Sequence, residues 1–422
     1  MIDPSLLRNN PEPLFASLEA RGAERSLVDH AVVADDARRH AIARFEELRA
    51  EQNVLGKSVA QASGDEKAQL VNSAKELAQR VKEAQAQLSD AEEEAKKALW
   101  ALPNIVIDGV PAGGEENFHT IKTVGVQPQF SFPALDHLEI AQRWGLIDMA
   151  RGAKVSGSRF YFLTGLGALL ENAIMQHGLQ SAVAAGFTPL IPPTLVRPEV
   201  MAGTGFLGEH SSEVYYLPDD ELYLTGTSEV ALAGFHSDEI IDLTSGPLRY
   251  VGMSTCYRRE AGSHGKDVTG IIRVHQFQKL EMFSYVAAED AEAEHEKLLA
   301  WQEQMLGDLG LHYRVIDVAA GDLGSSAARK YDIEAWIPSQ GTFRELTSTS
   351  NCTTYQARRL NVRHRPEADG PTETVATLNG TLATTRWIVA LLETHQQEDG
   401  SVVIPDVLRP YMGGHERMGS VG

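Results

Sequence analysis

A repeat of small and apolar residues near the start of the chain constrains the fold most. Residues 35–102 contain no proline, and such residues return there at alternating steps of three and four, on both sides of a break at "SVAQASGDEK". This period of 3.5 residues is typical of the seam between two helices of a coiled coil. The seam consists of Ala41, Phe45, Leu48, Gln52, Leu55 and Val59 before the break and Leu70, Ala74, Leu77, Val81, Ala84, Leu88, Ala91, Ala95, Ala98 and Leu102 after it. The sequence therefore predicts an antiparallel helical hairpin that turns near Ser63 and Gly64.

The charge of this hairpin differs from that of the whole chain. Residues 38–82 carry nine basic and six acidic side chains, whereas the formal net charge of the chain is −20. Two interpretations remain open at this point: a solvated coiled coil with mixed charges, or an arm that grips a polyanion through its phosphates. The candidate contacts of such an arm are Arg38, Arg39, Arg44, Arg49, Lys57, Lys75 and Arg80.

The character of the sequence changes after residue 103. Prolines and glycines in "LPNIVIDGVPAGGEEN" suggest a linker over 104–117, followed by a domain over 118–422 in which short apolar runs alternate with turns. We predict helices at 164–185, 290–309 and 382–397 and strands around 214–225, 248–260, 271–286, 312–318 and 332–348. Short loops between the strands favour an antiparallel sheet flanked by helices. We therefore predict an α+β domain that follows the helical arm of residues 1–103 in the chain.

Composition excludes several classes of function. The net charge of −20 argues against non-specific binding to DNA or to an anionic membrane. The start "MIDPSLLRNNPEP" does not resemble a signal peptide, and no apolar run is long enough to span a bilayer. Cys256 and Cys352 lie far apart without a C-x-x-C partner, so neither a zinc cluster nor a disulfide framework is indicated. We expect a cytoplasmic protein without zinc.

Two adjacent predicted strands carry many charges. Because side chains alternate between faces, Arg258 and Glu260 share one face and Arg259 points the other way. In the next strand one face is expected to carry Ile271, Arg273, His275, Phe277, Lys279, Glu281 and Phe283. This row could be a ladder of cross-strand salt bridges. It could instead bind an elongated ligand, with an arginine on a phosphate, a ring on a base and a carboxylate on an amine.

Three further patches carry polar groups suited to such a ligand. "YLTGTSEVAL" places Thr227, Ser228 and Glu229 where a strand runs into a helix. In "GTFRELTSTSN", Glu345 and Ser348 could hold Mg²⁺, although such a pair is more often a turn or a cap. In "LNGTLATTRWIVALLE" a glycine turn leads to Arg386, which opens a helix where it opposes the macrodipole and so requires an anion nearby.

With these patches in this order, the chain resembles the seryl-tRNA synthetase family of class II aminoacyl-tRNA synthetases over essentially its whole length. "YRREAGSHGKD…RVHQFQKLE" resembles motif 2 of the family and "LNGTLATTR" resembles motif 3. "AGFTPLIPPTLVRPEVM" resembles motif 1, which lies at the dimer interface, and the hairpin resembles the tRNA-binding arm.

The resemblance implies a role for each candidate residue. Arg258, Glu260 and Arg386 would be catalytic, with Arg258 on the α-phosphate of ATP, Glu260 at the adenine end and Arg386 stacking on adenine near the γ-phosphate. Phe277 would stack on the other face of adenine, beside the backbone of Val274, and Glu345 and Ser348 would hold Mg²⁺. The remaining ATP contacts would be Arg259, Arg273, Leu346 and Thr347, and serine would be bound by Thr227, Ser228, Glu229, Arg258, Glu281, Asn379 and Thr381.

The sequence departs from the family pattern at three places. Thr385 stands where glycine or proline commonly precedes the arginine of motif 3, and the stretch from Asn379 to Arg386 is one residue shorter than the commoner pattern. In the loop of motif 2, Val268 and Thr269 stand where threonine and arginine are common.

The resemblance implies an enzyme that activates L-serine with ATP and Mg²⁺ and transfers it to tRNA(Ser), and to tRNA(Sec) where that tRNA is present. It also implies a homodimer. Three rivals remain: a ligase that loads a carrier protein, a non-catalytic paralogue, and a coiled-coil tether with an inert globular end. The hairpin argues against the first rival, and the set Arg258, Glu260, Glu281, Glu345 and Arg386 argues against the other two.

Overall fold

The computed structural model describes residues 1–208, 211–261 and 269–419. It divides into two compact units, Met1–Ile105 and Val106–Gly422. We describe each unit by itself.

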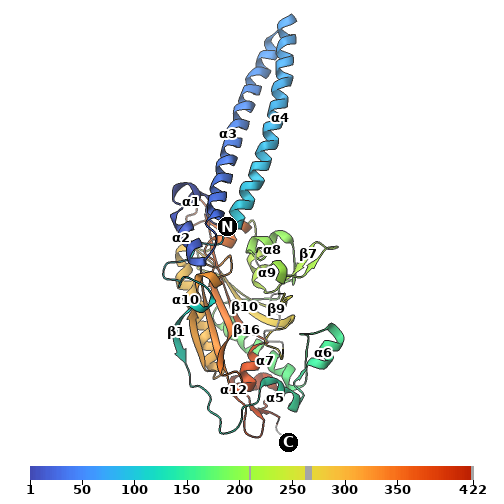
Figure 1. The fold of residues 1–422 in the computed structure, drawn as a ribbon, viewed down its shortest axis with the longest axis vertical. Coiled ribbons are helices and arrows are strands. Elements are labelled where there is room, and N and C mark those ends of the chain that lie inside the picture. Colours follow the sequence, from blue (N-terminus) through green and yellow to red (C-terminus); the bar gives the residue numbers. More distant parts are fainter. Residues whose placement is uncertain (209–210, 262–268, 420–422) are drawn as a thin grey trace. The chain divides into compact units, whose positions relative to one another are not determined.

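The first unit is built around two long helices that run side by side, α3 (Ser26–Gln61) and α4 (Gly64–Ala101) (Figure 1). The seam predicted from the sequence is buried at Leu48, Leu77 and Ala84, with Phe45 and Val81 packed against them. At about 1.5 Å per residue, α4 is roughly 57 Å long. The coiled-coil hairpin is therefore confirmed.

The start of the first unit was not predicted. Helix α3 begins at Ser26 rather than near residue 35, and two short helices precede it, α1 (Pro4–Asn9) and α2 (Glu12–Arg21). Leu7, Leu14 and Leu18 of these helices pack with Val28 of α3 and Ala98 of α4. This contact buries apolar residues that lie outside the 3.5-residue repeat, and so the repeat gave no sign of them.

The second unit contains an eight-stranded sheet in the order β1-β11-β12-β13-β16-β10-β9-β4. All neighbouring strands are antiparallel except β4 and β9, which are parallel. The strands are β1 (His119–Val124), β4 (Thr188–Leu190), β9 (Leu248–Tyr257), β10 (Gln276–Val286), β11 (Tyr313–Asp317), β12 (Arg329–Ile337), β13 (Thr342–Asn351) and β16 (Ala376–Thr384). The predicted antiparallel sheet with flanking helices is confirmed.

Three helices pack with this sheet in one large apolar core: α7 (Leu166–Ala184), α10 (Ala291–Asp308) and α12 (Trp387–Thr394). Gly178 lets α7 approach β10 closely, since a Cβ at this position would lie 2.9 Å from Leu280 Cδ2. Because side chains alternate along β10, Leu280 faces this core while Lys279 and Glu281 face the other side of the sheet. The helices thus cover one face, and polar side chains are gathered on the other.

Smaller elements complete the second unit. The helices are α5 (His137–Trp144), α6 (Met149–Ser156), α8 (Pro198–Thr204), α9 (Glu229–Gly234) and α11 (Tyr355–Leu360). The short strands are β2 (Ile147–Asp148), β3 (Phe162–Leu163), β5 (Leu195–Val196), β6 (Tyr216–Leu217), β7 (Leu222–Leu224), β8 (Ile240–Ile241), β14 (Arg363–His364), β15 (Glu373–Thr374), β17 (Val402–Val403) and β18 (Arg417–Met418). None of the helices in the described ranges is long and apolar enough to cross a membrane.

The structure corrects four predicted elements. The strand expected over 214–225 is two short strands, β6 and β7, which pair antiparallel. Strand β10 begins at Gln276, so residues 271–275 are not part of it and the predicted row on one face is shorter than expected. The segment over 332–348 is two strands, β12 and β13, joined by a turn at 338–341. Residues 376–384 are the central strand β16 rather than a glycine turn and the start of a helix; Gly380 there packs closely against Thr349, with its Cβ position 3.2 Å from Thr349 Oγ1.

Candidate active site

A cavity of about 100 Å³ lies over the polar face of the sheet. It lies between β10, β13, β16 and the segments that follow β9 and precede α12. Its lining includes Arg258, Glu260, Arg273, Val274, Phe277, Lys279, Glu345, Leu346, Ser348, Thr381, Thr385 and Arg386. Ten of these residues were predicted as site residues, although they come from segments up to 128 positions apart in the chain, from Arg258 to Arg386.

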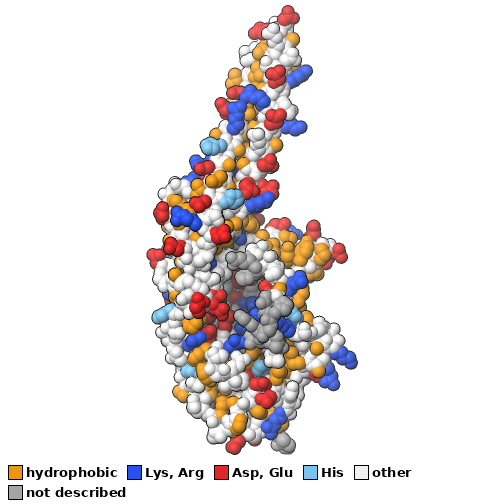
Figure 2. All heavy atoms as spheres, in the orientation of Figure 1, with side chains coloured by type: hydrophobic (Ala, Val, Ile, Leu, Met, Phe, Trp, Pro, Cys, Tyr) orange, Lys and Arg blue, Asp and Glu red, His pale blue; other side chains and the backbone are white. Residues whose placement is uncertain are grey.

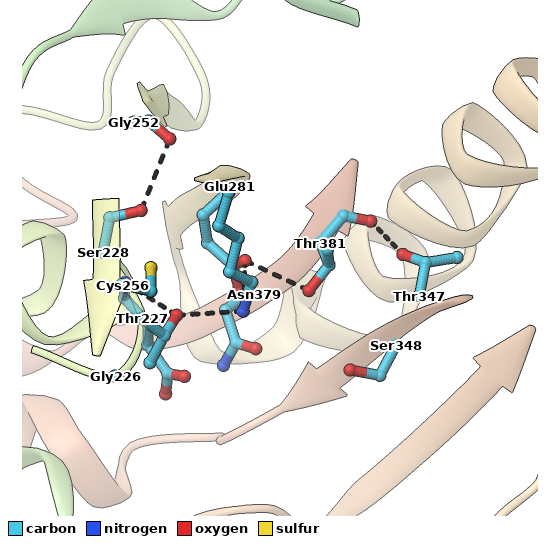
Figure 3. Close-up of polar contacts among 12 residues, drawn as sticks. Gly226, Thr227, Ser228, Gly252, Cys256, Glu281, Thr347, Ser348, Asn379 and Thr381 are labelled. Atoms are coloured by element: carbon cyan, nitrogen blue, oxygen red, sulfur yellow. Dashed lines mark hydrogen bonds and ion pairs between the residues drawn. The ribbon is translucent and has the colours of Figure 1, made fainter. Parts of the chain in front are cut away.

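One end of the cavity carries a buried cluster of an ammonium, two hydroxyls and a carboxylate. Lys279 Nζ lies 2.7 Å from Glu281 Oε2 and donates a hydrogen bond of 3.0 Å to Thr227 Oγ1. Thr381 Oγ1 donates to Glu281 Oε2 over 3.2 Å. Figure 3 shows the side chains of Thr227, Glu281 and Thr381 gathered together from the segment before α9, from β10 and from β16. Such a cluster can bind a small molecule that carries an amine and a hydroxyl.

Glu229 lies beside this cluster in the first turn of α9. Its Oε1 accepts a hydrogen bond of 2.8 Å from Gln356 Nε2. Burial raises the pKa of Glu229 to about 7, and the nearby Glu281 carboxylate adds to this, while Gln356, Lys279 and Arg258 oppose it. The charge of this carboxyl group therefore changes near neutral pH.

Two arginines line the cavity: Arg258 follows β9, and Arg386 directly precedes α12. Arg258 Nε donates to the carbonyl oxygen of Gly226 over 3.2 Å, and its guanidinium lies 5.2 Å from the centre of the Phe277 ring. Arg386 donates from Nε to the carbonyl oxygen of Ile272 and from Nη1 to that of Glu345, over 3.1 and 2.8 Å. Burial lowers the pKa of Arg386, but the neighbouring Glu345 opposes this effect. The arginines and the ring can hold phosphates and a flat base.

Arg273 and Glu260 form an ion pair of 3.1 Å at the edge of the cavity. Glu260 has a φ of 51°, in the left-handed region that is uncommon for residues other than glycine. This conformation turns the chain at the end of the segment after β9. Because Arg273 also lies outside β10, the two residues meet through these turns and not through a ladder of paired strands.

Glu345 and Ser348 line the same cavity although they are three residues apart on β13. Strict alternation would place them on opposite faces of the sheet. The register between β12 and β13 shifts by one residue here, because Ile333 pairs with Thr347 while Glu334 pairs with Glu345. This β-bulge at Leu346 breaks the alternation and brings carboxylate and hydroxyl to one side.

Glu345 is surrounded by positive charge. Its burial disfavours ionisation, but Lys330, Arg386 and Arg258 outweigh burial and hold its pKa below the usual range. Lys330 Nζ also lies 3.0 Å from Asp332 Oδ2, and burial raises the pKa of Asp332 to about 7. These groups line a second cavity of about 490 Å³ that shares Arg273, Glu345 and Arg386 with the first.

The described residues contain no group of three or more histidine, cysteine, aspartate or glutamate side chains placed to hold a metal ion. Glu345 and Ser348 are a different donor set, because an ionised carboxylate and a hydroxyl are hard oxygen ligands. They fit a magnesium ion that takes its remaining ligands from water and from phosphates of a substrate. Both cysteines are free and buried.

Seven predicted site residues do not line the first cavity directly. Thr227 and Glu281 belong to the cluster described above and Glu229 lies beside it; the other four are Arg259, Ser228, Thr347 and Asn379. Arg259 lies 5.8 Å from the centre of the Tyr215 ring, and Ser228 Oγ donates to the Gly252 carbonyl oxygen over 3.3 Å. Thr347 Oγ1 donates to the carbonyl oxygen of Thr381 and accepts from Gln302 Nε2 over 3.0 Å. Asn379 Nδ2 donates to Cys352 Sγ over 3.6 Å. The bonds of Ser228, Thr347 and Asn379 connect neighbouring segments around the site, and Figure 3 shows those of Ser228 and Thr347.

Sequence reasoning did not assign a role to several residues of the site. Lys279 was seen as part of a charged row, but its place between Thr227 and Glu281 depends on tertiary structure. Gln302 comes from α10 and donates to both Thr347 and the carbonyl oxygen of Thr381. An isolated glutamine in an amphipathic helix gives no signal of such a contact. The predicted loop residues 262–268, including Val268, lie outside the described residues.

The basic residues of the hairpin occur among acidic ones, as Figure 2 shows along both helices. Arg38 and Arg39 pair with Asp35, and Arg44 pairs with Glu47. Arg49 lies 5.5 Å from the centre of the Phe45 ring. For Lys57, Lys75 and Arg80, no ion pair is found within the part of the chain that the structure describes.

Two family models match the chain. Residues 1–106 match the seryl-tRNA synthetase N-terminal domain, and residues 215–395 match the tRNA synthetase class II core domain (G, H, P, S and T). The serine–tRNA ligase of Leifsonia xyli subsp. xyli is 65% identical over 422 residues, covering 100% of both chains. That of Clavibacter michiganensis subsp. michiganensis is 65% identical over 416 residues, covering 99% of this chain and 97% of the relative.

Solved structures agree with these matches. The crystal structure of seryl-tRNA synthetase from Pyrococcus horikoshii complexed with ATP has a TM-score of 0.93 at 38% identity, covering 100% of both chains. The structure of A. aeolicus tRNASec in complex with M. kandleri SerRS has a TM-score of 0.60 at 18% identity, covering 82% of this chain and 72% of that one, and supports the fold alone.

The antiparallel sheet, the arginine-lined cavity on its polar face and the core-domain match define a class II aminoacyl-tRNA synthetase. The N-terminal match and the relatives at 65% identity over nearly full length narrow this class. The chain belongs to the serine–tRNA ligase family.

Proposed function

We propose that the protein activates L-serine with ATP and transfers the serine to the 3′ end of tRNA(Ser). One observation supports this function most strongly. A single cavity is lined by Arg258 and Arg386 and also by Lys279 and Thr381, which are hydrogen-bonded to the buried residues Thr227 and Glu281. A site with these two sets of groups could bind a nucleotide and an amino acid next to each other. It also argues against an inert globular end or a paralogue that has lost its site.

At the nucleotide end, we assign the adenine to the slot between Phe277 and Arg386, with Glu260 and the backbone of Val274 at its edge. The guanidinium of Arg258 lies over the Phe277 ring, and we assign it to the α-phosphate. Arg273, paired with Glu260, stands beside this slot. Leu346 of β13 lines the cavity, and we assign it to one wall of the adenine site.

At the amino-acid end, Glu229 and Glu281 supply negative charge for the ammonium group of serine. We assign Thr381 to the serine hydroxyl, since its own hydroxyl donates to Glu281 and its oxygen can still accept a hydrogen bond. Alanine would leave these buried polar groups unpaired, so the site is expected to reject it strongly. We expect threonine to be excluded sterically.

In the first step the serine carboxylate oxygen attacks the α-phosphorus of ATP and pyrophosphate leaves, which gives seryl-adenylate. No nucleophile from the protein is needed, and the chain contributes by alignment and charge neutralisation. Arg258 and Arg386 offset the negative charge that develops on the transferring phosphoryl group. In the second step the hydroxyl of the terminal tRNA ribose attacks the activated carbonyl and AMP leaves.

Glu345 and Ser348 are the residues that we assign to Mg²⁺, which neutralises phosphate charge when bound. The low pKa of Glu345, held by Lys330 and Arg386 against burial, keeps this carboxylate ionised at neutral pH. The chain thereby holds a hard, charged ligand ready beside the phosphate site.

We assign tRNA binding to the coiled-coil hairpin, which the seryl-tRNA synthetase N-terminal model covers. Lys57, Lys75 and Arg80 are its leading phosphate contacts, since Arg38, Arg39 and Arg44 already pair with acids. A relative has been solved with tRNASec, so tRNA(Sec) is a second candidate substrate where it is present. We also propose a homodimer that works in the cytoplasm.

ATP–pyrophosphate exchange tests the activity, with serine, threonine, alanine and glycine compared in the presence of Mg²⁺ and without tRNA. Exchange with serine alone is expected. Exchange with another amino acid would keep the reaction but overturn the substrate, and no exchange with any of them would refute the catalytic assignment.

Removal of residues 40–85 separates the two proposed modules. The shortened chain is expected to lose charging of tRNA(Ser) and to keep serine-dependent exchange, because no residue of the cavity lies in the removed segment. A charge-neutral variant of Lys57, Lys75 and Arg80 to glutamine provides a folded control with the hairpin in place. Loss of exchange in the shortened chain would contradict the division into modules.

A further inference from the structure

Thr385 is buried directly before Arg386, at the point where β16 ends and α12 begins. Its hydroxyl group both accepts and donates a hydrogen bond. Oγ1 accepts a hydrogen bond of 2.9 Å from the backbone N–H of Gln278, and it donates to Glu171 Oε1. The backbone N–H of Thr385 donates in turn to the carbonyl oxygen of Gln278 over 3.2 Å.

These bonds extend the pairing of β10 with β16 beyond its last backbone pair, Lys279 with Thr384. At the next position the chain turns out of the strand, and the side chain of Thr385 takes the N–H of Gln278 that a continued strand would have paired. Glycine or proline could supply neither hydroxyl bond. The link is therefore specific to a residue with a hydroxyl here.

The two residues joined by this link each have a neighbour in the nucleotide site. Gln278 follows Phe277, and Thr385 precedes Arg386. Phe277 and Arg386 are the two groups assigned to opposite faces of the adenine. The distance between their main chains is thus fixed by the pair of hydrogen bonds between Thr385 and Gln278.

Glu171 supports the link from helix α7. It is partly buried, and its carboxylate accepts a hydrogen bond from the Thr385 hydroxyl, so that the hydroxyl oxygen can accept a hydrogen bond from the Gln278 N–H. Tyr161 adds a longer contact, with its hydroxyl 3.5 Å from Thr385 Oγ1. No other described residue donates to or accepts from the Thr385 side chain.

We propose that Thr385, oriented by Glu171, is a positioning residue that sets the width of the adenine slot between Phe277 and Arg386. This inference rests on the proposed function, because it concerns the nucleotide half of the same site. It assigns no contact with substrate to Thr385 or Glu171. Their effect should therefore fall on ATP and spare serine.

The test compares Thr385→Val, which keeps the shape but removes the hydroxyl, with Thr385→Ser, which keeps the hydroxyl. In ATP–pyrophosphate exchange, Thr385→Val is expected to raise KM for ATP about tenfold, in line with the loss of one buried hydrogen bond to a charged group. KM for serine should change less than twofold, and Thr385→Ser should lie close to the wild type. Thr342→Val, at an exposed threonine on β13, is the matched control.

A double-mutant cycle with Glu171→Ala tests the supporting contact. Glu171→Ala alone should raise KM for ATP by a smaller factor, and the double variant should be no worse than Thr385→Val alone. Glu171→Gln, which keeps an acceptor, should stay within threefold of the wild type. Thermal melting of each variant reports whether the fold is retained, and the serine and glutamine variants keep the test valid if valine impairs folding.

Several results would overturn the proposal. These are an unchanged KM for ATP in Thr385→Val, an equal rise in KM for serine, or a Thr385→Ser variant as impaired as the valine variant. Additive effects in the cycle would remove the role of Glu171. The wild type separates the two hypotheses: absence of its exchange activity would refute the proposed function, whereas a normal Thr385→Val enzyme would refute only the positioning role.

Discussion

Glu229 offers a test in which protein stability and enzyme activity are expected to move in opposite directions. Burial and the nearby Glu281 raise the pKa of Glu229 to about 7 from an ordinary value of 4.5. The difference corresponds to about 3 kcal/mol of folding free energy. Glu229→Gln keeps the size of the side chain and an acceptor for Gln356, but removes the charge.

The sign follows from proton binding. A raised pKa means that the folded protein binds more protons than the unfolded chain between about pH 4.5 and 7, so the free energy of unfolding rises as the pH falls through this window. Above pH 7 the wild type carries the full cost of a buried charge. Glu229→Gln should therefore be more stable than the wild type by up to about 3 kcal/mol at pH 8, and by about 1 kcal/mol at pH 5.

The activity should change the other way. If the ionised Glu229 receives the serine ammonium group, about one tenth of the enzyme is competent at pH 6, and kcat/KM for serine should fall about tenfold between pH 8 and pH 6. Glu229→Gln should show a low and flat profile over this range. Glu199→Gln, an exposed carboxylate on α8, should match the wild type in both properties.

The measurements are thermal melting at pH 8 and pH 5 and serine-dependent exchange across pH 6–8. A Glu229→Gln enzyme with normal kcat/KM and a persistent acidic limb would refute the reasoning and assign the ammonium group to Glu281. Equal stability of variant and wild type at pH 8 would show that the buried charge is already compensated by Lys279 and Arg258.

Three further predictions concern other parts of the chain. Phe277→Leu should raise KM for ATP in exchange by about tenfold with KM for serine unchanged, because stacking on a base contributes ~1–3 kcal/mol; an unchanged KM would remove the ring from the adenine site. Glu345→Gln should raise the Mg²⁺ concentration needed for half-maximal exchange without altering the melting temperature at saturating ATP, and an unaltered Mg²⁺ titration would contradict its role as a ligand. Leu48→Ala should destabilise the hairpin by ~2–4 kcal/mol in urea unfolding and leave exchange unaffected, since the side chain lies 2% exposed in the seam between α3 and α4.

Local patterns account for the parts of this protein that were predicted correctly. The hairpin follows from a period of 3.5 residues, which needs no information beyond neighbouring positions because two helices bury the repeat against each other. The antiparallel sheet follows from short loops between apolar strands. Ten residues of the cavity follow from motifs whose order in the chain resembles a known family.

Patterns failed where a distant contact overrides the local signal. Residues 376–384 contain Gly380 and several hydroxyls and resemble a turn, yet they form the central strand β16. Gln302 and Thr349 pack against the glycine, and the hydroxyls of Thr377 and Thr381 donate to Gln356 and Glu281. Helices α1 and α2 escaped prediction because their apolar residues are buried against α3 and α4 and follow no long repeat.

The sequence by itself determined the architecture, the family and the chemical types of the residues in the site, because all three depend on periodicity and motif. Only the tertiary structure decided how those residues act together. The bulge at Leu346 brings Glu345 and Ser348 to one side of β13, and burial beside Glu281 moves the pKa of Glu229 to about 7. The hydroxyl of Thr385 accepts a hydrogen bond from the backbone of Gln278, next to Phe277 and Arg386 in the chain. These effects arise from residues that are far apart in the chain and close in the fold, or from a shift of strand register, and neither can be seen along the chain.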